Sequence, residues 1–228
     1  MQGIASITLA MMSLLILAVV GFIGWQIAHH AVLLQKGSAT SQHSSCLGTY
    51  HDKNLCHYAE HNFSIVDNSF TSNIHVTSPQ GIISTLKFSA DGKGNTSVDG
   101  TANGQELSTI LLNGATYVKT NGLSWIEYPK GATNAPAQTN PTATMDITVG
   151  NKDLRFSYLG RMSCGNISCY KYLVGEQSQP ATTQYIWFDT TGYLLREWSY
   201  QGATGTTDMT ISSYQPVTIT APSPVQIV

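Results

Sequence analysis

Charged side chains are scarce in this sequence. Lys, Arg, Asp and Glu together make up 11% of the 228 residues, and the formal net charge is −2. A chain with so few basic residues lacks the positively charged surface by which proteins bind nucleic acids. We therefore expect no nucleic-acid partner.

The scarcity is greatest at the N-terminus, where residues 1–35 contain no charged side chain. Folded as a helix, the apolar segment 4–28 would extend roughly 37 Å, enough to cross a hydrocarbon core of ~30 Å. The segment lacks the basic start and the small-residue cleavage site of a secretory signal peptide. It also lacks the polar stripe of a buried core helix. We predict that residues 1–35 form a single transmembrane signal anchor, with a cleaved signal peptide and a core helix as the alternatives.

The sequence contains only four cysteines, and all of them follow residue 45. An even number of cysteines favours disulfides and hence an oxidising compartment. Four cysteines allow three pairings, and we favour the two local ones, Cys46–Cys56 and Cys164–Cys169. The chain is therefore predicted to be a single-pass protein of the cell membrane whose C-terminal domain lies outside the cytoplasm.

The first residues carry a short family pattern. The run Gly3-Ile4-Ala5-Ser6-Ile7-Thr8, followed by the apolar segment, resembles the N-terminal helix of type IV pilin-like proteins. In that family a peptidase cuts after a glycine that precedes the helix, so the resemblance implies processing between Gly3 and Ile4. The family usually has Glu where this chain has Thr8, and a basic leader where this chain has two uncharged residues. An ordinary signal anchor is the alternative.

Beyond a small-residue linker at 36–45, the sequence predicts one β-rich domain over residues 46–228. The dipeptides Asp91-Gly92, Asn113-Gly114 and Asn121-Gly122 lie between apolar runs, where they favour tight hairpin turns. Helix signals are few, and 51–62 is the best of them. We expect a mainly β fold, a curved antiparallel sheet with one or two short helices. The predicted strands are 82–89, 107–112, 115–120, 124–128, 154–159, 169–174, 184–189, 193–200, 206–213 and 217–220.

A second family pattern runs through these strands. It comprises Tyr117-Val118-Lys119, Tyr185-Ile186-Trp187-Phe188-Asp189 and Gly192-Tyr193-Leu194-Leu195-Arg196, with Pro216 to Pro222 at the end. Together they resemble the superfamily of bacterial lipoprotein carriers and LppX-type lipid-binding proteins, the LolA/LppX-like proteins of the cell envelope. The resemblance implies a U-shaped half-barrel whose concave face holds acyl chains beneath covering helices.

Catalytic motifs are missing. The sequence has no G-x-S-x-G elbow, and its two S-x-x-K strings, at 84–87 and 168–171, fall in predicted strands or a turn rather than on a helix. His51, His57 and His61 with Cys46 and Cys56 could be drawn as a zinc cluster, but a polar helix beside a disulfide explains them better. We predict no metal, no cofactor and no enzymatic activity.

Aromatic residues are the remaining candidates for a binding site. Phe88, Trp125, Trp187, Trp198 and Tyr200 could line a concave apolar pocket, the alternative being that they belong to the sheet core. The sequence thus predicts a membrane-anchored, extracytoplasmic protein that binds a lipid, an acyl chain or another hydrophobic ligand. The alternative is a pilin-like or envelope structural protein without a small-molecule ligand. The sequence leaves the oligomeric state open.

Overall fold

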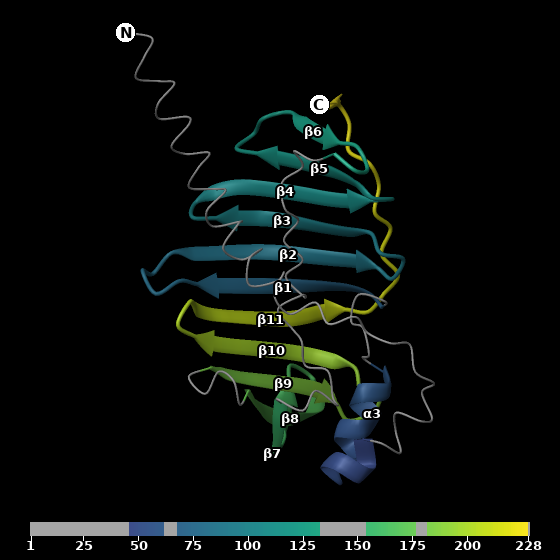
Figure 1. Ribbon diagram of the computed structural model, residues 1–228, viewed down its shortest axis with the longest axis vertical. Coiled ribbons are helices and arrows are strands. Elements are labelled where there is room, and N and C mark those ends of the chain that lie inside the picture. Colours follow the sequence, from purple (N-terminus) through teal and green to yellow (C-terminus); the bar gives the residue numbers. More distant parts are fainter. Residues whose placement is uncertain (1–45, 62–67, 133–153, 177–181, 228) are drawn as a thin grey trace.

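The computed structural model describes residues 46–61, 68–132, 154–176 and 182–227. Their strands form one twelve-stranded sheet in the order β12-β6-β5-β4-β3-β2-β1-β11-β10-β9-β8-β7 (Figure 1). The sheet is open, since β12 and β7 are its two edges, and it is antiparallel apart from the β12–β6 pair. The predicted curved antiparallel sheet is confirmed at this level.

The described residues form short helices and twelve strands. One helix, α3, spans Lys53–His61, and residues 46–50 form a further helical segment. The strands are β1 (Ser69–Thr77), β2 (Ile83–Asp91), β3 (Thr96–Ala102), β4 (Gln105–Leu112), β5 (Ala115–Thr120), β6 (Trp125–Tyr128), β7 (Leu154–Cys164), β8 (Ile167–Glu176), β9 (Thr183–Asp189), β10 (Leu195–Gly202), β11 (Gly205–Ser213) and β12 (Val225–Ile227).

Two antiparallel meanders meet at the centre of the sheet. Strands β1 to β6 form the first and β7 to β11 the second, and the β1–β11 pair joins them. After β11 the chain runs past the ends of the first meander and adds β12 beside β6 (Figure 1).

The observed strands differ from the predicted ones in three places. Strands β1 and β3 were not predicted, and β3 contains Asp99 and Gly100, residue types that are depleted in strands. The strand predicted at 217–220 is wrong. There the Val217 amide donates to the Ser69 hydroxyl at 2.7 Å instead of joining a ladder, and pairing resumes only at β12.

The predicted hairpin turns are present. Asn113 and Asn121 have positive φ values of 53° and 46°, and each precedes a glycine that is also at positive φ. In the β2–β3 turn, the Asp91 carboxylate accepts hydrogen bonds from the Lys93 and Asn95 amides at 2.7 and 3.1 Å. These local interactions fix the register of the first meander.

Glycine is required inside β3. Gly100 has a φ of 155°, and a Cβ at this position would collide with the backbone carbonyl oxygen of Thr85 on β2. The close approach of β2 and β3 therefore depends on the missing side chain.

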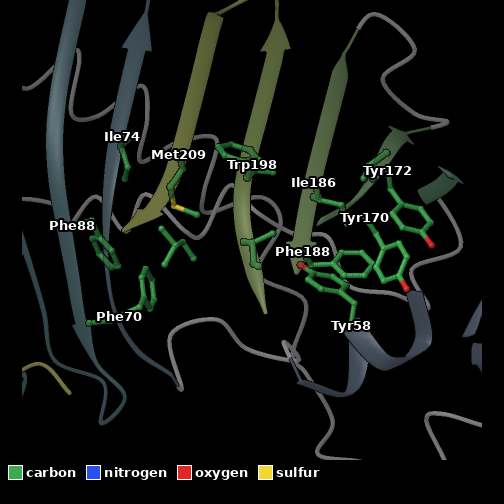
Figure 2. Packing of buried hydrophobic residues seen from close by; sticks show 14 of the residues in the cluster. Tyr58, Phe70, Ile74, Phe88, Tyr170, Tyr172, Ile186, Phe188, Trp198 and Met209 are labelled. Atoms are coloured by element: carbon green, nitrogen blue, oxygen red, sulfur yellow. The ribbon is translucent and has the colours of Figure 1, made fainter. Parts of the chain in front are cut away.

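One face of the sheet carries the core. Cross-strand pairing aligns Ile74, Met209, Trp198, Ile186 and Tyr172 in a single row, and all five are buried. Figure 2 shows this row together with Tyr58 of α3, which stacks on Phe188 of the same face. We call this side the helix-bearing face and the opposite side the outer face.

The predictions for the N-terminus lie outside the described residues. These are the anchor at 1–35, the linker at 36–45 and the processing site at Gly3 and Ile4. Among the residues that are described, no helix is long and apolar enough to cross a bilayer.

Candidate functional site

The helix-bearing face is closed at the β8–β9 end by α3. The Tyr58 ring is 3% exposed and stacks on Phe188 with a centroid distance of 4.6 Å. Tyr170 and Tyr172 surround the same Phe188 ring, at 5.6 and 5.3 Å. Tyr58, Phe188 and these two rings thus pack against one another beneath the helix.

Asp52 holds the helix in this position. Its Oδ1 accepts hydrogen bonds from the Asn54 and Leu55 amides at 2.9 and 3.1 Å, so it caps the N-terminus of α3. Its Oδ2 accepts the Tyr172 hydroxyl proton at 2.7 Å. Burial raises the pKa of Tyr172, and the hydrogen bond to Asp52 raises it further, so this hydroxyl stays protonated and donates. One carboxylate thus both starts the helix and attaches it to β8.

Two disulfides fix the chain at this end of the sheet. Cys46 pairs with Cys56 and ties the first helical segment to α3, and Cys164 pairs with Cys169 across the β7–β8 turn. These are the two local pairs favoured from the sequence. The zinc alternative loses its sulfur ligands, because Cys46 and Cys56 are bonded to each other.

Beyond the helix, the same face continues as an apolar surface across the first meander. We call it the apolar stripe, and all its members are half-buried. Register places them on one side of β1 to β6: Val76, Leu86, Leu107, Leu111, Val118 and Ile126. The contacts that α3 and residues 46–50 make with the sheet lie on β7, β8 and β9 instead. The stripe is therefore the candidate ligand-binding surface among the described residues.

The predicted pocket aromatics do not all lie on this face. Phe88 and Trp198 are buried in the core, and Tyr200 packs against it. Register places Trp125 and Trp187 on the outer face, so the prediction that all five share one face is wrong for these two. Alternation along a strand shows which residues lie together, but not which side meets the core.

Sequence reasoning missed most of the stripe because its residues are ordinary aliphatics. No single strand carries a clear signal for it, because in β4 both sets of alternating positions, Leu107-Thr109-Leu111 and Ser108-Ile110-Leu112, contain apolar residues.

Polar groups interrupt the buried part of the face in two places. The Trp198 indole donates to the Gln184 side-chain oxygen at 3.2 Å. The Ser72 hydroxyl is fully buried, and within the described part of the chain it has no hydrogen-bond partner. Gln184 lies in the cross-strand row that leads through Tyr200 and Thr207 to Val76, and Ser72 lies on the same face of β1 as Val76.

Two hollows lie elsewhere, at the turn between β7 and β8. One has a volume of about 340 Å³ and is lined by Met162, Ile167 and neighbouring turn residues. The other, of about 300 Å³, is bounded by Asp189 and Arg196. Arg196 donates to Asp189 from Nη2 at 2.8 Å, so the charge at this hollow is already paired. The described ranges contain no group of three metal-ligating side chains.

Neither a protein-family model nor a curated protein sequence matches the chain. Solved structures show a similar arrangement of strands. Lipoprotein LppX of Mycobacterium tuberculosis has a TM-score of 0.49 at 15% identity, over 78% of this chain and 99% of that chain. LprF of Mycobacterium bovis has 0.49 at 12%, over 73% and 95%. A LolA-superfamily protein of Nitrosomonas europaea has 0.29 at 12%, over 78% and 95%.

The described residues themselves form an open, mainly antiparallel sheet with short helices, the architecture expected from the resemblance to LolA/LppX-like proteins. Because the identities are 15% or lower and the TM-scores fall below 0.5, the likeness transfers no ligand and no binding site to this chain.

Proposed function

We propose that this chain is a non-enzymatic, membrane-anchored protein of the extracytoplasmic side that binds a hydrophobic ligand along the apolar stripe. The observation that carries the proposal is the distribution of charge on β2 to β6. All charged side chains of these strands lie on the outer face: Lys87, Asp91, Asp99, Glu106, Lys119 and Glu127. The helix-bearing face of the same strands carries none.

This distribution favours an apolar occupant. A sheet face in contact with water normally carries polar and charged residues, as the outer face of β2 to β6 does. An acyl chain lying along the stripe would gain about 0.8 kcal/mol for each methylene removed from water. Because the face offers no charge to pair with, a ligand with a long apolar part fits it better than a polar metabolite.

The filled core favours the alternative, an envelope structural or interaction protein without a small-molecule ligand. The rings of Tyr58 and Phe188 stack on each other beneath α3, and the hollows of about 340 and 300 Å³ lie at the β7–β8 turn rather than on the stripe. Lipid binding therefore requires that the ligand occupy the stripe of the first meander and not the space under the helix.

Binding is tested on the full-length chain in mild detergent with a fluorescent fatty acid. Leu107→Gln and Leu111→Gln each remove an apolar side chain from the stripe. The matched controls are Ile110→Gln and Leu112→Gln, which lie on the same strand but on the outer face. We expect each stripe variant to weaken binding by roughly tenfold, which corresponds to about 1.4 kcal/mol of lost contact. The control variants should bind like the wild type.

The two readings give different results in this experiment. No saturable binding by the wild type, and no lipid retained in native mass spectrometry, would support the structural alternative. Equal losses in the stripe and control variants would show that the fatty acid binds somewhere else. Thermal unfolding of each variant separates loss of the site from loss of the fold.

The membrane anchor is a separate part of the proposal with its own test. Resistance of the cellular protein to carbonate extraction would support insertion of residues 1–35. N-terminal sequencing distinguishes a retained Met1 from a chain that begins at Ile4, as the pilin-like resemblance implies. Recovery of a soluble mature chain that starts after residue 28 would show that the segment is a cleaved signal.

A further inference from the structure

The hairpin of β7 and β8 exposes more large apolar side chains than any other hairpin in the described ranges. Leu159, Met162 and Ile167 are 48%, 37% and 40% exposed. They lie on the edge strand β7 and at the start of β8, where the sheet ends. A cluster of exposed apolar side chains of this kind marks a surface that interacts with another protein or with a membrane.

The charge of the hairpin is opposite to that of the whole chain. The hairpin, residues 154–176, contains three basic residues, Arg155, Arg161 and Lys171, and one acidic residue, Glu176 at its open end, whereas the chain has a net charge of −2. Both arginines are exposed. A partner complementary to this surface is therefore both negatively charged and apolar.

The outer face next to the turn adds aromatic rings. The Lys171 ammonium lies 4.4 Å from the Tyr185 ring and 4.5 Å from the Trp187 ring, which keeps its charge close to the sheet. The Trp187 indole N–H donates to the Met162 sulfur at 3.0 Å. Glu197 on β10 is the acidic neighbour of this group, and burial raises its pKa although Lys171 lowers it. Tryptophan and tyrosine beside basic residues are typical of the water–bilayer interface.

The turn is held in one conformation. The Cys164–Cys169 disulfide closes it, and the Thr190 amide donates to the Ser168 carbonyl at 3.0 Å, which ties it to the β9–β10 connection. A rigid turn loses little conformational entropy when it docks on a surface.

The described chain also begins at this end of the sheet. Tyr50 packs edge-on against Phe156 of β7, with a centroid distance of 5.5 Å. The linker predicted at 36–45 reaches roughly 35 Å when extended. If residues 1–35 are inserted in a bilayer, β7 therefore lies within reach of the membrane surface.

We propose that the β7–β8 hairpin docks on the surface of an anionic lipid bilayer, with Leu159, Met162 and Ile167 entering the interface. Arg155 and Lys171 lie on the outer face, on the side of Trp187, and face the lipid head groups. Arg161 lies on the helix-bearing face, where it donates to the Tyr170 hydroxyl at 2.9 Å. Each basic residue near an anionic surface shifts the docking equilibrium about fivefold. Two of them shift it roughly 25-fold relative to a neutral bilayer. This inference is independent of whether the apolar stripe binds a ligand.

The test uses the full-length chain reconstituted in nanodiscs of phosphatidylcholine alone, or of phosphatidylcholine with an equal amount of phosphatidylglycerol. Hydrogen exchange of the amides at 155–168 is measured in both. We expect severalfold slower exchange in the anionic discs, and we expect added salt to remove the difference because it screens exposed charges. Equal exchange in the two kinds of disc would overturn the proposal.

Matched variants identify the residues responsible. Leu159→Ser combined with Ile167→Ser should abolish the protection, whereas Ile83→Ser combined with Leu123→Ser should leave it intact. The control residues are 53% and 63% exposed and lie on the first meander, so both pairs remove comparable apolar surface. Arg155→Gln should reduce the protection without removing apolar area.

One further outcome would also overturn the proposal. Protection of β7 that grows with protein concentration and is the same in both lipids would show that the edge strand pairs with a second copy of the chain. Unfolding temperatures of all variants confirm that the fold is unchanged in each comparison.

Discussion

Replacement of Asp52 should show how firmly α3 is attached to the sheet. Its carboxylate caps the helix through two backbone amides and also accepts the Tyr172 hydroxyl proton at 2.7 Å. Loss of an N-cap costs about 1 kcal/mol. Loss of a hydrogen bond to a charged group costs about 1.5–3 kcal/mol. Asp52→Ala should therefore lower the free energy of unfolding by about 3 kcal/mol, the sum of the two effects.

Two further variants separate the cap from the bond to β8. Asparagine caps helices as well as aspartate does, so Asp52→Asn should lose about 1–2 kcal/mol, mainly from the weakened bond to Tyr172. Tyr172→Phe removes the same bond and leaves the cap, and it should cost a similar amount. The double variant Asp52→Ala with Tyr172→Phe should then lose less than the sum of the single variants, with a coupling of about 1.5 kcal/mol or more.

The assay is urea unfolding of the full-length chain in one detergent, followed by tryptophan fluorescence. Equal slopes of free energy against urea in all variants are needed for the comparison, because the slope reports the surface exposed on unfolding. Strict additivity of the Asp52 and Tyr172 substitutions would refute the reasoning, since the two side chains would then not interact in solution. In that case the packing of Leu55 and Tyr58 in the core would hold the helix.

Three other outcomes are expected. Gly100→Ala should lower the free energy of unfolding by about 1–3 kcal/mol because its Cβ meets backbone, whereas Gly175→Ala, with open space around it, should change it by less than about 0.5 kcal/mol in the same urea assay. Burial acts to raise the pKa of Asp91, but side-chain and backbone hydrogen bonds lower it below its ordinary value. Its carboxylate thus stabilises the fold above about pH 4, and this stabilisation is lost as the pH falls through the lowered folded-state pKa. Asp91→Asn should therefore lower the unfolding temperature at neutral pH and match the wild type in strong acid. Replacing Cys164 and Cys169 by serine should cost about 2 kcal/mol for a loop with a sequence separation of 5, measured by urea unfolding against the oxidised parent.

The sequence predicted the fold well wherever local chemistry decides it. Asn113 and Asn121 adopt the positive φ that their turns require, and the local cysteine pairs form as favoured. Strand β3 escaped prediction because its pairing with β2 depends on the close approach at Gly100, which is a long-range effect. Strand β12, which pairs in parallel with β6, was not predicted either. It has only three residues, too few to show an alternation of apolar and polar side chains.

The candidate site was harder to predict than the fold. Trp187 and Trp198 look alike in the sequence, yet one lies on the outer face and the other in the core, because each alternates with different neighbours on its strand. The apolar stripe depends on the register of β1 to β6 together, and no single strand reveals it. Only the relative placement of the strands shows that one face is free of charge.

The path of the chain after β11 affects how the sheet unfolds. In the described sheet, the hydrogen bonds between the two meanders are those of the β1–β11 ladder, and one buried cluster contains residues of both. The C-terminal segment connects the end of the second meander to β6, the strand of the first meander that lies farthest from it. On the way, the Val217 amide is bonded to Ser69 at the start of β1. Separation of β1 from β11 therefore also strains the pairing of β12 with β6. For this reason we expect one cooperative unfolding transition rather than two.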